Sequence, residues 1–133
     1  MSDLLKDLED YYIDQSIVTA DGTDVFRDFM PESPDNCVSL IEYSGDVAFM
    51  AKMANRSVQV KARNTDYDLA RAKINALFDA VYDPESDVRI VDFTAGRWGI
   101  VKPRQYPFML PKVVSDERFI FVFNMSVVTP FDS

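Results

Sequence analysis

Apolar residues recur at intervals of three and four in two stretches of the chain, as they do along the buried face of a helix. The first stretch spans residues 2–15, and the second spans residues 67–81. We therefore predict two amphipathic helices, each with one face turned to a core. The expected N-cap residues are Ser2 or Asp3 for the first helix and Asn64 or Thr65 for the second.

Alternation of apolar and polar residues, the pattern of a half-buried β-strand, is clearest over residues 56–63. There Val58, Val60 and Ala62 alternate with polar side chains. Residues 118–128 begin with apolar side chains at successive positions, which is typical of a central strand. The predicted strands are residues 37–43, ended by a turn at 44–46, then 56–63, 88–93 and 118–128, while residues 47–54 are apolar without a clear period.

The order of these elements predicts an α+β fold, in which two helices pack on one face of a mixed, mostly antiparallel sheet of four to six strands. A doubly wound parallel sheet is disfavoured, because only one strand–helix–strand unit is present and no glycine-rich loop follows a strand. The length of 133 residues suits a single domain. Within it we expect an acidic helix and loop at 1–36, an α+β core at 37–128, and a basic extended arm at 94–112 that prolines interrupt.

Charge is distributed unevenly along the sequence. The formal net charge is −8, and residues 1–36, with ten acidic and two basic residues, account for all of it. Residues 94–115 contain four basic residues and no acidic one. A pI near 4.4 disfavours a dedicated nucleic-acid-binding protein, whose affinity depends on clustered Lys and Arg. The separation of an acidic segment from a basic segment suits contact between copies of the chain or with another protein.

The composition leaves few routes to catalysis. The chain has no histidine and one cysteine, Cys37, which excludes Cys/His zinc sites, Ser-His-Asp triads and an internal disulfide. The spacing of Asp21, Asp24 and Asp28 matches no calcium loop. We therefore expect no enzymatic activity, no metal and no cofactor. The acidic N-terminus and the lack of a long apolar stretch predict neither secretion nor a membrane partner, so we expect the chain to remain in the cytoplasm where it is made.

Three segments, PESPDNCVSLIEYSG, SVQVKARNTDYDLARAKINALFDAVY and LPKVVSDERFIFVFNMSVV, resemble the minor capsid and tail-terminator family of long-tailed bacteriophages, which includes the lambda tail terminator. The similarity covers most of residues 30–128, and its most specific part is the unit in which a strand ends at Arg63 and a helix follows with Tyr67 and Ala70. It implies a structural subunit of the virion tail or neck. In that family, such subunits form a hexameric ring that caps the tail tube, stops its polymerisation and joins the tail to the head.

The residues by themselves are also compatible with other functions. One is a head-completion or stopper protein at the same neck. Another is a small cytoplasmic α+β module that binds a ligand or a regulatory partner. An enzyme would have to rely on Asp and Arg side chains, which makes it the least favoured alternative. The partners implied by the tail-terminator resemblance are further copies of the chain, the tail tube protein, and a head-completion or stopper protein, with DNA only as the passing genome.

The charge pattern also suggests where contacts form. We expect the basic arm of one subunit to reach an acidic surface of its neighbour, although it can instead pack on its own subunit, the tail tube or DNA. Arg63, at a strand end, is expected to form a local or intersubunit ion pair. The interface candidates on the arm are Arg97, Lys102 and Arg104 as steering charges and Trp98, Tyr106 and Phe108 as apolar anchors. The acids that are candidates to line a ring channel and repel the genome are Asp3, Asp7, Glu9, Asp10 and Asp14.

Overall fold

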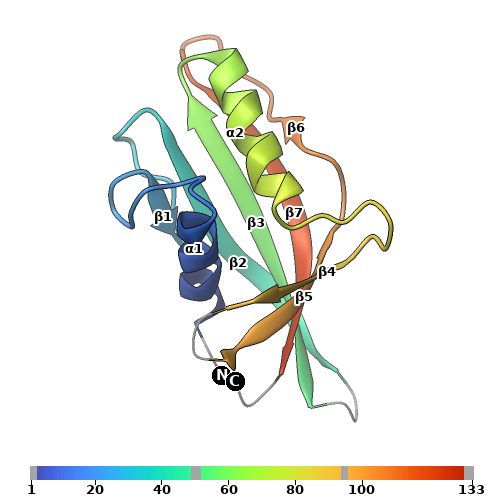
Figure 1. Cartoon of the computed structure of the whole chain (residues 1–133). Coiled ribbons are helices and arrows are strands. Elements are labelled where there is room, and N and C mark those ends of the chain that lie inside the picture. The colour runs from blue at the N-terminus through green and yellow to red at the C-terminus, as the bar shows by residue number, and fades with distance from the viewer. Residues whose placement is uncertain (1–2, 49–51, 94–95, 131–133) are drawn as a thin grey trace.

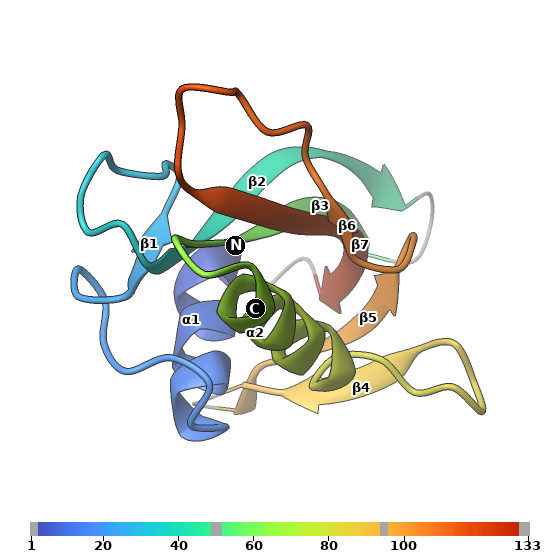
Figure 2. The same ribbon diagram turned by 90° about the horizontal axis from the view of Figure 1, so that it is seen from above.

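The computed structural model describes residues 3–48, 52–93 and 96–130 of the chain (Figure 1). Both helices lie on one face of a single twisted sheet, and the views from the front and from above agree on this (Figures 1 and 2). The elements in chain order are α1 (Leu4–Asp14), β1 (Val25–Arg27), β2 (Cys37–Ala48), β3 (Met53–Asn64), α2 (Tyr67–Asp79), β4 (Arg89–Asp92), β5 (Trp98–Pro103), β6 (Phe108–Met109) and β7 (Phe119–Pro130).

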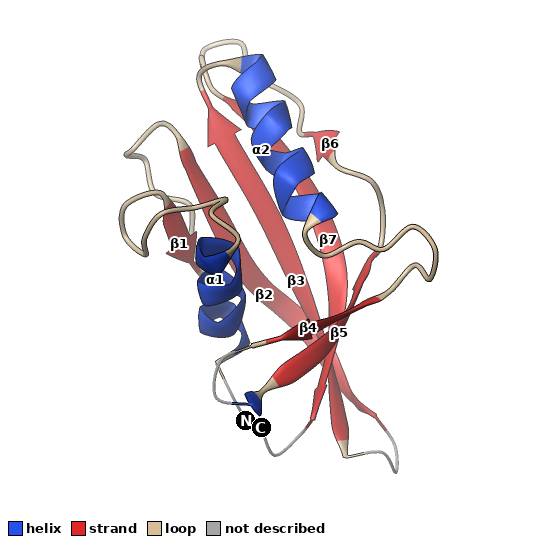
Figure 3. Cartoon of the chain, in the orientation of Figure 1, coloured by secondary structure: helices blue, strands red, loops and turns tan. Residues whose placement is uncertain are grey.

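The sheet has seven strands in the order β1-β2-β3-β7-β5-β4, and β6 pairs with β7 outside this path. Only β1 and β2 pair in parallel among the described strands, and the other pairs are antiparallel. Three long strands, β2, β3 and β7, form most of the sheet, and the sheet twists so strongly that β4 and β5 run across the direction of the long strands in the view of Figure 3. The predicted α+β class, with a mostly antiparallel sheet and two helices on one face, is confirmed.

The core lies between the helices and the inner face of the sheet. The alternation predicted for β3 is confirmed, because Val58, Val60 and Ala62 are all buried there, and Val60 is paired with the equally buried Phe123 of β7. The hydroxyl of Tyr12 on α1 donates a hydrogen bond to the Leu77 carbonyl of α2 at 3.1 Å, which ties the helices together. Neither helix described here is long and apolar enough to span a bilayer.

The helix boundaries follow the sequence prediction closely, except at one cap. Asp3 caps α1 by accepting a hydrogen bond from the Lys6 backbone N–H, as expected. The prediction for α2 was wrong, because Asp66 is the N-cap and accepts from the Leu69 N–H at 3.1 Å. Asn64 instead ends β3, and its side chain accepts a hydrogen bond from the Asp66 N–H.

The structure has more strands than the predicted four to six. Strands β1 and β6 are three and two residues long, too short for a periodic pattern, and β5 lies within the segment expected to be an arm. The predicted turn at 44–46 was also wrong, since β2 continues to Ala48 through a bulge between Glu42 and Ser44. Gly45 is needed there for a close backbone approach, because a Cβ would lie 2.5 Å from the Asn55 carbonyl oxygen. Residues 49–51, part of the stretch without a clear period, lie outside the described residues.

Candidate interaction surfaces

Much of the segment expected to be an arm belongs to the sheet of its own subunit. Strand β5 pairs with β4 on one side and with β7 on the other, and β6 pairs with β7. Trp98 begins β5 and is half-buried, while Phe108 lies on β6 opposite Val122 and is exposed. The segment therefore has its main backbone contacts within one chain, and only its outward side chains are available to a neighbour.

Arg97 uses its charge inside the subunit. Its Nε and Nη2 atoms donate to the two carboxylate oxygens of Asp7 at 2.9 and 2.7 Å. Asp7 lies on α1 and is only 3% exposed. The expected attraction between the acidic N-terminal region and the basic segment thus exists, but here it joins two parts of one chain that are 90 residues apart.

Two of the acids proposed for a channel wall face the interior of the subunit. Glu9, like Asp7, is 3% exposed, and its Oε2 atom accepts no hydrogen bond from any described residue. Burial first, and then the neighbouring Asp21 carboxylate, raises the pKa of Glu9 from 4.5 to about 7, although Arg27 Nε lies 3.7 Å from Oε2. Neither acid can line a channel from this position. The remaining channel candidates, all open to solvent to some degree, are Asp3, Asp10 and Asp14.

Arg63 fixes a loop of its own subunit, and the local ion pair that was one of its two expected contacts does not form among the described residues. Its buried guanidinium donates three hydrogen bonds to backbone carbonyls, those of Asp35 at 3.0 Å, Pro34 at 2.8 Å and Pro31 at 2.5 Å. The proline-containing loop after β1 is thereby attached to the end of β3. This gives a physical reason for an arginine at the end of that strand, and it removes Arg63 from the accessible surface.

Lys102 and Arg104 remain as exposed cations. The guanidinium of Arg104 donates to neutral oxygens only, Ser126 Oγ at 2.9 Å, Tyr43 OH at 3.0 Å and Ser57 Oγ at 2.7 Å. Lys102 is paired in register with Ser126, so it extends on the face of the sheet opposite the helices. No carboxylate within the described parts of the chain forms an ion pair with either cation. Both stay candidates for contact with an acidic partner.

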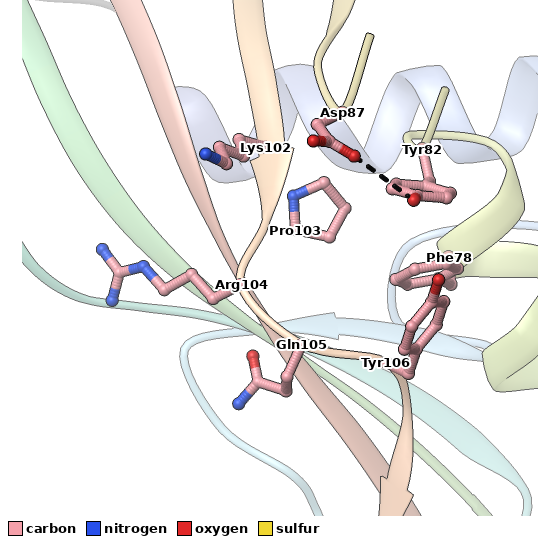
Figure 4. Close-up of a pocket in the computed structure, with 8 residues that line it drawn as sticks. All are labelled: Phe78, Tyr82, Asp87, Lys102, Pro103, Arg104, Gln105 and Tyr106. Atoms are coloured by element: carbon pink, nitrogen blue, oxygen red, sulfur yellow. Dashed lines mark hydrogen bonds between the residues drawn. The ribbon is translucent and has the colours of Figure 1, made fainter. Parts of the chain in front are cut away.

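Next to these cations lies a pocket of about 430 Å³ between the end of α2 and the residues that follow β5. Figure 4 shows the rings of Phe78, Tyr82 and Tyr106 on one side of it and Lys102 and Arg104 on the other, with the charged ends of both side chains directed away from the rings. The Phe78 ring centroid is 4.9 Å from that of Tyr82 and 5.5 Å from that of Tyr106. We call Phe78, Tyr82 and Tyr106 the aromatic pocket.

A carboxylate lies at the rim of the aromatic pocket. Asp87 Oδ1 is 3.5 Å from the Tyr82 hydroxyl, which donates to it. The hydrogen bond with Tyr106, with this carboxylate as a smaller cause, raises the pKa of Tyr82 to about 12. Tyr82 therefore presents a neutral hydroxyl-bearing ring at neutral pH, suited to apolar contact with a polar edge.

The sequence pattern did not indicate that Phe78 and Tyr82 line a pocket or that Phe29 is exposed. Phe78 and Tyr82 are four residues apart, so a helical pattern places them on one face, but nothing in the pattern brings Tyr106 against them. Phe29, at the opposite edge of the sheet beyond β1, is 56% exposed. An isolated phenylalanine in a loop carries no periodic signal that distinguishes an exposed side chain from a buried one.

Comparisons with known proteins agree with this fold and supply a family. A chain in the "virion of native gene transfer agent (GTA) particle" has a similar structure, with a TM-score of 0.57 and 17% sequence identity over 95% of this chain and 93% of that one. No curated protein sequence matches. The family model described as "Bacteriophage tail terminator protein" matches residues 12–129, which include every described strand except the last residue of β7. The chain therefore belongs to the family of bacteriophage tail terminator proteins.

Proposed function

We propose that this chain is the tail terminator of a long-tailed phage, forming a homohexameric ring that caps the tail tube, stops its polymerisation and joins the tail to the head. The match of the family model over residues 12–129 carries this proposal. Membership of that family makes the chain a structural protein of the phage tail. The ring, the cap and the junction are the specific actions by which a structural subunit would end a tube.

Two features of the subunit support assembly with other copies. The sheet is open at both ends, because β1 and β4 each have one neighbour in the described part of the sheet, so backbone groups remain for contacts there. Large apolar side chains are exposed at separate places, among them Phe29 beside β1 and Ile90 on β4. A closed ring needs different, complementary surfaces on two sides of each subunit, and these edges offer them.

The partners in this proposal are further copies of the chain, the tail tube protein, and a head-completion or stopper protein. The genome would pass through the ring without specific binding, and Asp3, Asp10 and Asp14 are the candidates to repel its phosphates. The subunit would fold in the host cytoplasm during assembly and end in the neck of the virion. None of these steps requires a bound metal, a cofactor or catalysis.

Light scattering combined with negative-stain imaging tests the proposal. The purified chain, alone or mixed with tube protein, should give a ring with a central hole, and its addition should shorten the tubes that the tube protein forms. A matched sample of tube protein with an unrelated acidic protein controls for charge. A chain that stays monomeric in both conditions and leaves tube length unchanged would refute the proposed function.

A further inference from the structure

Phe29 is an exposed aromatic side chain on a well-fixed backbone. Its carbonyl accepts a hydrogen bond from Ser39 Oγ at 2.9 Å, and the preceding Asp28 N–H donates to the Leu40 carbonyl at 2.8 Å. The Phe26 ring lies edge-on to it, with the centroids 6.0 Å apart. Little conformational entropy is therefore left to lose when the Phe29 ring is buried by a partner.

The aromatic pocket has the chemistry to receive such a ring. Phe78, Tyr82 and Tyr106 already contact one another in tilted and edge-on geometries, the arrangements that aromatic side chains prefer. Tyr106 is 70% exposed, although its neighbour Phe78 is buried, so one more ring against it would remove a large apolar surface from water. The volume of about 430 Å³ leaves room for a phenyl group.

The two sites carry opposite charge. Asp28 and Asp21 lie with Phe29 and Phe26 around an open hollow, where the one cation, Arg27, is already within 3.3 to 3.7 Å of three carboxylates. Lys102 and Arg104 both line the pocket and form no ion pair among the described residues. The Arg104 guanidinium is directed across the sheet to Ser57 and Tyr43, so Lys102 is the cation that can meet an acid bound at the pocket. Asp87 is the one acid that lines this pocket, and its charge offsets part of the attraction that Lys102 exerts on an incoming acidic segment.

The two sites also lie at opposite edges of the sheet. Phe29 follows β1, the first strand in the sheet order, whereas the aromatic pocket lies beyond β7 at the other side. In both views β1 and the turn after α2 are at opposite ends of the molecule (Figures 1 and 2). A subunit can therefore use one site toward one neighbour and the other site toward the next, as a head-to-tail ring requires.

We propose that Phe29 of one copy inserts into the aromatic pocket of the next copy, with Asp28 facing Lys102. The proposal rests on the proposed ring and names the contact that closes it. Its apolar part is aromatic on both sides, which is typical of the few residues that dominate an interface. Lys102 and Tyr106 keep the intersubunit role expected from sequence, whereas Arg97, Arg63 and the guanidinium of Arg104 do not take part in this contact.

Two truncations of the full chain test the contact, Phe29→Ala and Tyr106→Ala. Both side chains are largely exposed, so each variant should keep the fold, which circular dichroism can verify. Each should raise the concentration of half-maximal assembly, measured by light scattering, at least about tenfold. The matched control is Val114→Ala, which shortens a fully exposed apolar side chain in a loop away from both sites and should assemble like the wild type.

Mixing the two variants gives the sharper result. Phe29→Ala keeps the pocket, and Tyr106→Ala keeps the phenylalanine. One molecule of each variant can therefore form one intact contact, after which neither has a complete site left to bind a third subunit. We expect a one-to-one heterodimer in the mixture, with neither variant assembling alone. If Tyr106→Ala proves unstable, Lys102→Glu replaces it, because this exposed side chain is outside the core, and it should slow assembly at low salt.

The outcomes separate this contact from the proposed function. A wild type that forms rings while both truncations assemble equally well would overturn the contact and leave the ring intact. Rings of Tyr106→Ala that form normally but no longer join tubes would assign the pocket to the tube protein and also overturn it. A wild type that never assembles, with or without tube protein, would refute the proposed function and this contact together.

Discussion

Replacing Glu9 by glutamine should stabilise the chain at neutral pH, although it removes a residue next to an arginine. Glu9 is buried, and its Oε2 atom accepts no hydrogen bond in the described structure. Burial and the Asp21 carboxylate together raise the pKa of Glu9 from 4.5 to about 7, despite Arg27 Nε at 3.7 Å. The folded state therefore disfavours the charged form that the unfolded chain adopts freely.

The sign and size of the effect follow from this shift. Below pH 4.5 the carboxyl is protonated in both states and costs nothing; between 4.5 and about 7 only the unfolded chain ionises, so stability falls as pH rises. Above about 7 the full penalty is present, and the shift corresponds to about 3 kcal/mol. Glu9→Gln is neutral throughout and avoids this loss.

Urea unfolding followed by the fluorescence of Trp98, the one tryptophan in the sequence, measures the effect at protein concentrations where scattering shows a monomer. The free energy of unfolding of Glu9→Gln minus that of the wild type should rise by about 3 kcal/mol between about pH 4.5 and about pH 8. Asp14→Asn, which removes an exposed charge from the same helix, is the matched control. A difference that stays constant with pH would refute the reasoning, and one that falls would show that Arg27 holds Glu9 in its charged form.

Three further substitutions test contacts inside the subunit. Asp7→Asn leaves a half-buried guanidinium without its carboxylate and should lower the free energy of unfolding in urea by about 2 kcal/mol. Arg63→Met leaves three loop carbonyls without a donor and should cost about 3 kcal/mol, with faster cleavage of the loop after β1 in limited proteolysis. Gly45→Ala places a Cβ against the Asn55 carbonyl and should lower the thermal midpoint, with a cost of about 1–3 kcal/mol, whereas Ser44→Ala on the same strand should not.

The parts of the fold that sequence predicted well are those with a strong period. The alternation in β3 identified its buried face, because Val58 and Val60 contact the core through every second position. The apolar positions of α2 likewise identified the face that includes Ile74 and Leu77. Strand β5 escaped prediction, because the prolines at and after its end indicated an isolated extended segment, and its pairing with the more distant β7 leaves no signal in the local sequence.

The interaction surfaces were predictable only in part, for a related reason. Charge segregation is visible in the sequence, but which charges meet is decided by the fold, which brings Arg97 to Asp7 across 90 residues. The aromatic pocket combines Phe78 and Tyr82, close in sequence, with Tyr106, which arrives through the pairing of β5 and β6 with β7. A pocket of this kind has no linear motif.

The fold divides the basic residues between two tasks, and this division explains how one charge pattern can serve both stability and assembly. Arg27 and Arg97 each meet acids of α1, and Arg97 brings one positive charge from outside the N-terminal region, so part of the negative charge of that region is neutralised within the subunit. Lys102 and Arg104 pair with no acid among the described residues. Lys102 lies on β5, in the half of the sheet away from Asp28, whereas the Arg104 guanidinium reaches Tyr43 of β2. Exposed charges are screened over about 8 Å at physiological salt, so these two can speed the encounter between copies but can do little to hold them. The subunits of an assembled ring must then be held together by the burial of apolar surface. The exposed aromatic side chains of Phe29 and Tyr106 provide such surface.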